Sequence, residues 1–127
     1  MQPFGLMLML GVAGALGAVA RYLVVEWVAP RWARRFPLAT FLINVTGAFA
    51  LGLLMTAGGN GPHAPTTVRL ILGTGFLGGY TTFSTLSYET DALARRGHTL
   101  HAWANAAGTL VVGVAAAGLG MWLGSRL

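Results

Sequence analysis

The chain has 127 residues, of which 55% are hydrophobic and only 9% are charged. A soluble domain carries about 25% charged residues, so this composition excludes a soluble globule and indicates a single-domain integral membrane protein. The net charge of +5 comes from eight arginines, no lysine and three acids, and no compact basic stripe points to nucleic acid. Because cysteine is absent, disulfides and thiolate metal sites are also excluded.

Four apolar stretches approach or exceed the length of about 20 residues that a helix needs to cross the hydrocarbon core. The predicted spans cover residues 4–28, 37–57, 66–93 and 100–123, and together they form one membrane domain over residues 1–127. The N-terminus lacks the positive region of a signal peptide, so the first span is expected to be retained. The sequence therefore predicts an all-α protein that crosses the cell membrane several times.

Small residues recur on two of these spans. The first span has Gly11, Gly14 and Gly17 at intervals of three residues, and the fourth has a similar stripe that includes Gly113 and Gly120. In lipid, small residues let helix backbones approach closely, because van der Waals packing drives their association. Both stripes predict close helix–helix packing.

The third span combines features that a lipid-facing helix normally avoids. Glycines interrupt it, a run of hydroxyls follows, and a carboxylate ends the run: Gly73, Gly75, Gly78, Gly79, Thr81, Thr82, Ser84, Thr85, Ser87 and Glu89. Glycine weakens a helix, and non-helical backbone at membrane depth is tolerated only inside protein or beside a polar cavity. The sequence predicts a break near Gly78–Thr81, whose freed carbonyls suit a weakly demanding cation better than zinc or copper.

Two polar side chains in the first two spans have more than one interpretation. Arg21 either extends its charge toward the membrane surface from a helix end or sets a positive potential near an anion vestibule. Asn44, with Thr40 and Gly47 on the same helical face, either hydrogen-bonds another helix or offers its NH2 group to an anion. The residues alone leave these alternatives open.

Further candidates follow the predicted break and lie on the fourth span. Phe83 and Leu86 are three residues apart and share a helical face. An aromatic ring has a positive edge, so Phe83 is either a core residue or a ring that stabilises a small anion. Asn105 and Thr109 form a polar pair one helical turn apart.

No set of residues indicates catalysis. The histidines, His63, His98 and His101, have no acid or cysteine at metal-ligand spacing, so a histidine metal site is not predicted. None of the three acids has a histidine at a spacing that implies partnership. The chain is therefore not expected to be an enzyme.

Three motifs follow one another along the chain: Gly-x-x-x-Arg-Tyr (17–22), Pro-Leu-Ala-Thr-Phe-Leu-Ile-Asn-Val-Thr-Gly (37–47) and Gly-Phe-Leu-Gly-Gly-Tyr-Thr-Thr-Phe-Ser-Thr-Leu-Ser-x-Glu (75–89). Together they resemble the fluoride channel family known as Fluc or CrcB, and the match covers all the predicted spans in order. The resemblance implies an antiparallel, dual-topology homodimer with two separate fluoride pathways. Bacteria use such channels to let cytoplasmic fluoride leak out passively.

The resemblance also implies roles for single residues. Backbone carbonyls of Gly78 and Thr81 would hold a structural sodium ion, Na+, at the dimer centre. The implied fluoride pathway comprises Asn44, Thr82, Phe83, Ser84, Thr85, Leu86, Asn105 and Thr109, with Arg21 near its vestibule. The family commonly has a second phenylalanine where this chain has Leu86, which brings conductance or selectivity into question. Leu86 is still expected to line the path, and fluoride passage is expected to persist.

Arginine positions bear on orientation. Five arginines lie in the first and third connections, against two on the opposite side, Arg69 and Arg126. The positive-inside rule would place those connections in the cytoplasm. An antiparallel dimer requires insertion in both directions, so either this bias is too weak to fix orientation or the chain pairs with an oppositely oriented paralogue. The homodimer is favoured, since one sequence keeps the motifs for both pore and ion site.

Two other functions remain as alternatives. A small multidrug-type transporter also has four spans, but it needs a membrane-embedded carboxylate, and Glu26 and Glu89 both lie near span ends. A non-transporting membrane scaffold would need neither the hydroxyl run nor a broken helix.

Overall fold

The computed structural model describes residues 2–58 and 64–127, and every regular element within those ranges is helical. Within these ranges, three helices are long and apolar enough to cross a membrane: α1 (Pro3–Val28) with the short turn η1 (Ala29–Arg31), α2 (Leu38–Thr56) and α6 (Thr99–Gly124). Their ends lie within one residue of the predicted ranges 4–28, 37–57 and 100–123. The protein is an all-α, multi-pass membrane protein.

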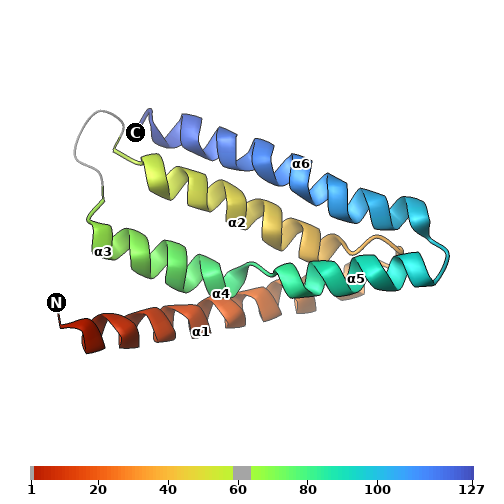
Figure 1. Ribbon diagram of the computed structural model, residues 1–127, viewed down its shortest axis with the longest axis horizontal. Helices are drawn as coiled ribbons and strands as arrows, with labels where there is room; N and C mark the ends of the chain where they lie inside the picture. Colours follow the sequence, from red (N-terminus) through yellow and green to blue (C-terminus); the bar gives the residue numbers. More distant parts are fainter. Residues whose placement is uncertain (1, 59–63) are drawn as a thin grey trace.

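The third predicted span is a succession of shorter segments (Figure 1). These are α3 (Thr66–Arg69), the π-helix η2 (Leu70–Leu77), α4 (Gly78–Tyr80) and α5 (Phe83–Arg95). The backbone becomes extended at Thr81 and Thr82, with ψ of 158° and 123°.

The break therefore lies at the C-terminal edge of the predicted stretch, and its glycines stay helical. Gly79 packs so closely on α1 that an added Cβ would collide with the carbonyl of Gly14. Gly79 thus serves contact with α1, whereas a Cβ at Gly78 would meet only the Gly73 carbonyl of its own span, at 3.9 Å. The break has another cause, described below.

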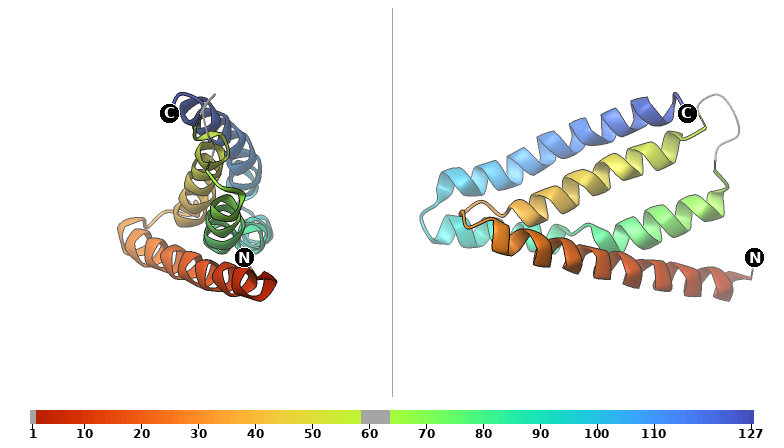
Figure 2. Two further views of the ribbon diagram at one scale, coloured as in Figure 1. Left: turned by 90° about the vertical axis from the view of Figure 1, so that its left-hand side faces the viewer. Right: turned by 180° about the vertical axis from the view of Figure 1, so that it is seen from behind.

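The long helices run along one another, and both chain ends lie at the same end of the molecule (Figures 1 and 2). The α1–α2 and α5–α6 connections lie at the opposite end. Helix α2 packs along α6, α1 packs along η2 and α4, and α5 packs on α6. The broken span consequently has α1 beside its first half and α6 beside its second half.

Close backbone contacts explain part of the small-residue stripes. A Cβ at Gly17 would collide with the carbonyl oxygen of Phe76 in η2, and one at Gly120 with that of Phe49 in α2. By contrast, a Cβ at Gly11 or Gly113 would meet no atom of the described residues within 4 Å. The predicted close packing is thus confirmed for Gly17 and Gly120, whereas Gly11 and Gly113 face open space.

The outer faces of α1 and α6 expose large apolar side chains, among them Leu8, Val12, Leu110 and Val111. Water would disfavour such a surface, but lipid tails solvate it well. The largest fully buried side chains are Ile43 on α2 and Asn105 on α6. A fully buried amide needs hydrogen-bond partners, so the polar groups near Asn105 are described next.

Candidate functional site

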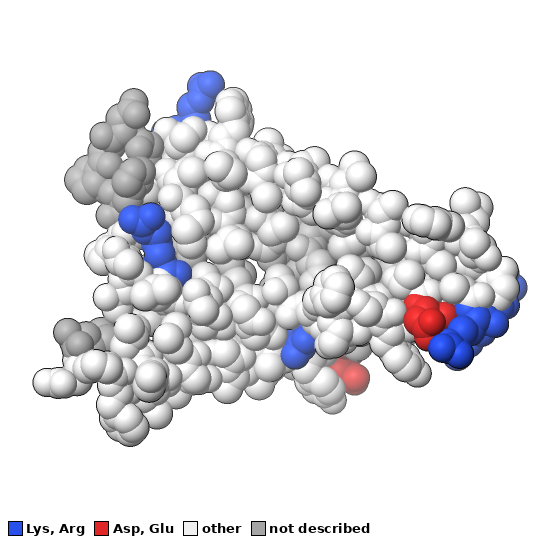
Figure 3. Space-filling view, viewed as in Figure 1, with Lys and Arg blue, Asp and Glu red and all other residues white. Residues whose placement is uncertain are grey.

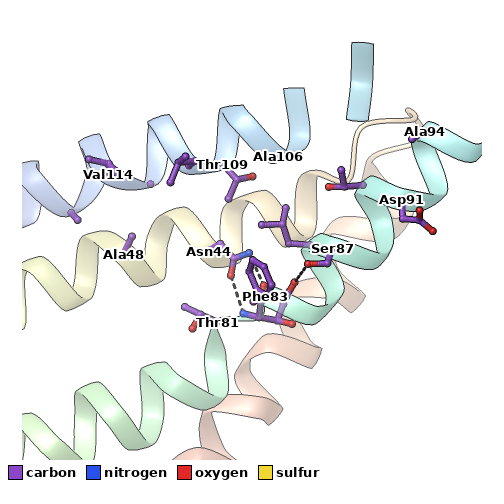
Figure 4. Close-up of a pocket in the computed structure, with 16 residues that line it drawn as sticks. Asn44, Ala48, Thr81, Phe83, Ser87, Asp91, Ala94, Ala106, Thr109 and Val114 are labelled. Atoms are coloured by element: carbon purple, nitrogen blue, oxygen red, sulfur yellow. Dashed lines mark hydrogen bonds between the residues drawn. The ribbon is translucent and has the colours of Figure 1, made fainter. Parts of the chain in front are cut away.

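A cavity of about 1000 Å³ lies against α2, α5 and α6 (Figure 4). Five members of the predicted fluoride pathway line this first cavity: Asn44, Thr82, Phe83, Leu86 and Thr109. Among the described residues that line it, Asp91 alone is charged, and its carboxylate pairs with Arg95 at 2.7 Å. The wall is therefore mostly apolar, with a few neutral hydrogen-bonding groups.

Asn44 holds the break in place. Its Nδ2 donates to the Thr82 carbonyl at 2.9 Å, and the Thr82 amide donates to its Oδ1 at 2.9 Å (Figure 4). The side-chain amide thus satisfies both backbone groups of an extended residue, which non-helical backbone inside a membrane requires. Of the two interpretations of Asn44, contact with another helical segment is present, and its NH2 group retains a second N–H.

The first hydroxyls after the break cap α5. The Thr85 amide donates to Thr82 Oγ1 at 3.2 Å, and the Thr82 hydroxyl donates to Thr85 Oγ1 at 3.1 Å. Ser84 Oγ lies 3.3 Å from Thr82 Oγ1. Threonine is a favoured residue at a helix N-cap, so this local sequence both ends the break and starts α5.

Two carbonyls at the break lose their usual helical partners. In an α-helix the carbonyl of Gly78 would accept from the Thr82 amide, which here donates to Asn44. The carbonyl of Thr81 would accept from the Thr85 amide, which here donates to Thr82 Oγ1. Both are uncharged, hard oxygen donors, so this donor set fits an alkali cation and does not fit zinc or copper.

Arg21 lies apart from the first cavity. It lines a second cavity of about 300 Å³ together with Thr40, Thr85 and Thr82. Thr82 lines both cavities. The guanidinium therefore stands on the α1 side of the break, whereas Phe83 and Leu86 stand on the α6 side.

Asn105 is not among the described residues that line the first cavity. It is fully buried, and its Nδ2 donates to Thr90 Oγ1 at 2.9 Å. Its Oδ1 and the hydroxyl of Thr109 are buried without a hydrogen-bond partner among the described residues. The predicted pair thus separates, since Thr109 lines the cavity and Asn105 ties α6 to α5.

Two threonines at this site received no role from the sequence. Thr40, 3% exposed, donates to Glu89 Oε1 at 3.0 Å, and Thr90 accepts the bond from Asn105. The placement of Thr40 one turn before Asn44 was the available signal, since it puts both side chains on one face of α2. Thr90 had no comparable signal.

The two described histidines, His98 and His101, lie close together. His98 Nδ1 lies 3.4 Å from Arg35 Nη1, and its ring stacks edge to face with that of His101. Within the described ranges no three acidic, histidine or cysteine side chains gather as metal ligands. His63 lies outside the described residues.

Comparison with known proteins identifies relatives over nearly the whole chain. Residues 8–121 match the family model described as CrcB-like protein, Camphor Resistance (CrcB). The Fluoride-specific ion channel FluC 1 of Leifsonia xyli is 49% identical over 92% of this chain and 85% of its own. The Fluoride-specific ion channel FluC of Deinococcus radiodurans is 48% identical over 99% of this chain and all of its own. That of Acidobacterium capsulatum is 43% identical over 94% of this chain and 96% of its own.

Proposed function

The chain belongs to the CrcB-like family, and we propose that it is a fluoride-selective channel, not an enzyme, through which fluoride leaves the cell passively. The names of its relatives supply the ion. The paired hydrogen bonds between Asn44 and Thr82 are the observation that carries the proposal, because they hold open a helix break beside a cavity with neutral polar groups.

In the proposed pathway, fluoride passes the residues of the first cavity. The ring edge of Phe83 and the free N–H of Asn44 offer partial positive charge, and the buried Thr109 hydroxyl offers a donor. None of these groups carries a full positive charge. Neutral groups suit conduction, because the pathway must bind fluoride strongly enough to admit it and weakly enough to release it.

Arg21 would act at the approach to this pathway. It lines the second cavity, where the hydroxyls of Thr40, Thr82 and Thr85 surround the space. A guanidinium there raises the local concentration of anions without standing in the narrow path. The hydroxyls of Thr85 and Ser84 would continue the polar surface around Thr82.

The functional unit would be an antiparallel homodimer with two pores. Phe83 is 82% exposed in the single chain although it lines the proposed path, so another surface must cover it. A second copy in the opposite orientation would do so and bring two breaks together. The carbonyls of Gly78 and Thr81 from both copies would then hold a structural sodium ion, which would neutralise their converging negative ends.

Fluoride efflux from proteoliposomes tests the function directly. Vesicles loaded with fluoride or with chloride are made with the purified chain, and a selective electrode follows release. We expect rapid fluoride release without matching chloride release. No fluoride release would refute the channel, and proton-coupled export of a cationic drug would favour the multidrug-type transporter.

Cross-linking tests the assembly. The natural chain has no cysteine, so every disulfide cross-link must join cysteines that were introduced. One variant carries a single cysteine near the C-terminus, and another carries one in the α5–α6 connection. In an antiparallel homodimer of the chain expressed alone, the two different cysteines should cross-link between copies. Cross-links only between identical positions would contradict the antiparallel arrangement, and efflux that requires a second gene product would favour the paralogue.

A further inference from the structure

One end of the molecule gathers exposed arginines. Basic side chains cluster at the end that carries the α5–α6 connection (Figure 3). The exposed arginines of the two connections at this end, here termed the arginine end, are Arg31, Arg34, Arg35, Arg95 and Arg96. Arg35 Nη1 lies 3.4 Å from His98 Nδ1, so the two connections are in contact. They therefore present one continuous basic surface.

Most of this charge is not neutralised within the chain. Arg95 pairs with Asp91, and both side chains are exposed. Within residues 2–58 and 64–127 that is the only salt bridge, although Glu26 lies little more than one turn before Arg31. The other four guanidinium groups of the arginine end thus have no carboxylate partner in the described parts of the chain.

Tryptophans fix the depth of two of these arginines. Arg31 lies over the ring of Trp27 at 4.5 Å and donates to the Trp27 carbonyl at 2.6 Å. Arg34 lies over the ring of Trp32 at 5.4 Å. Tryptophan is enriched at the membrane–water boundary, at the level of the lipid headgroups. The guanidinium groups are thus held where lipid phosphates lie.

We propose that the arginine end binds the headgroups of anionic phospholipids. A guanidinium presents a planar fork of N–H donors that matches two phosphate oxygens, and it is always charged. Zwitterionic lipids also carry a phosphate, but their own cation competes for it. A lipid with net negative charge is therefore the ligand whose charge complements this surface.

The opposite end of the chain supplies a matched control. Arg126 lies over the ring of Trp122 at 4.7 Å, much as Arg31 lies over Trp27. The other arginine at that end, Arg69, donates from Nε to the Ala64 carbonyl at 3.0 Å. One arginine–tryptophan pair without a cluster around it should not distinguish lipids in the same way.

Lipid retention tests the proposal. The purified chain is placed in micelles with equal amounts of phosphatidylglycerol and phosphatidylcholine, and retained lipid is measured by mass spectrometry after gel filtration. Engaging one guanidinium would enrich phosphatidylglycerol by about fivefold, and we expect a larger enrichment because several guanidinium groups of the arginine end act together. The triple variant Arg34→Gln/Arg35→Gln/Arg96→Gln should lose most of the enrichment, because it leaves Arg31 as the one guanidinium of the arginine end without a described carboxylate partner, and Arg126→Gln should keep most of it.

Measurements on the natural chain do not depend on whether the triple variant folds. High salt should remove the enrichment from the natural chain, because it screens exposed charges. Equal retention of both lipids, or unchanged enrichment in the triple variant, would overturn the proposal. So would displacement of the lipid by millimolar inorganic phosphate, which would indicate a free-anion site, or tighter binding of a short DNA duplex.

Discussion

Asn44 and Thr82 are joined by two hydrogen bonds of 2.9 Å that run in opposite directions. Such an exchange is ordinarily made between two backbones in a sheet, and here one partner is a side chain. It ties α2 to the break between α4 and α5. The position of Phe83, the next residue, depends on it.

Asn44→Ala should therefore damage both stability and transport. It leaves the Thr82 amide and carbonyl unpaired, and each unpaired buried group costs about 1–3 kcal/mol. We expect a lower unfolding temperature and fluoride efflux slower by about tenfold or more, which corresponds to about 1.4 kcal/mol. Ser125→Ala is the control, since the exposed Ser125 hydroxyl donates to the Trp122 carbonyl three residues earlier in the chain and lies far from the break in sequence. If Asn44→Ala unfolds at the same temperature as the natural chain, the paired hydrogen bonds between Asn44 and Thr82 do not stabilise the break.

Leu86→Phe should raise selectivity for fluoride over chloride. Leu86 lines the same cavity as Phe83, so a ring at this position would add a second positive edge to the proposed path. Proteoliposome efflux of both anions measures the ratio. Phe83→Leu should lower it, and Leu119→Phe, at a 57% exposed position, should leave it unchanged. If Phe83→Leu keeps the natural ratio, ring edges do not determine selectivity.

Thr40→Val should destabilise the fold through Glu89. Valine keeps the shape of threonine but removes the hydroxyl that donates to Glu89 Oε1, and Glu89 Oε2 is already buried without a described partner. We expect a loss of about 1–3 kcal/mol in the free energy of unfolding.

Two further variants test whether the loss of stability in Thr40→Val comes from its hydrogen bond to Glu89. Asp91→Asn removes a carboxylate from an exposed pair and should cost no more than about 1 kcal/mol. The effects of Thr40→Val and Glu89→Gln should not add, because the two side chains are in contact. Strict additivity in the double variant would count against a direct bond.

Gly120→Ala and Gly118→Ala should behave differently although they lie on the same helix. A Cβ at residue 120 would collide with the Phe49 carbonyl of α2, whereas one at residue 118 meets nothing within 4 Å. We expect Gly120→Ala to destabilise by about 1–3 kcal/mol. Gly118→Ala should be neutral or slightly stabilising, since alanine favours helix by about 1 kcal/mol. Thermal unfolding in detergent compares them, and equal effects would contradict the α2–α6 contact.

Hydrophobic length alone located the long helices. The ranges 4–28, 37–57 and 100–123 differ from α1, α2 and α6 by no more than one residue at either end. This succeeds because the thickness of a bilayer determines the length of an apolar helix that crosses it. The sequence also singled out the third span as unusual, and the motifs there supported the family.

The internal organisation of that span could not be predicted in the same way. Glycine propensity pointed to Gly78 and Gly79, but both are helical, and the backbone extends only where Asn44 takes the amide and carbonyl of Thr82. A contact between residues 38 positions apart leaves no local signature. The bond between Asn105 and Thr90 likewise depends on how α5 and α6 face each other.

Thr82 borders both cavities, so at that position the wall between them is one residue thick. Its hydroxyl is held by the amide and hydroxyl of Thr85, and its backbone is held by Asn44. The side chain thus works as a fixed partition between two chambers, one beside Arg21 and the other beside Phe83. A substitution that changes its volume would therefore alter the walls of both cavities at once.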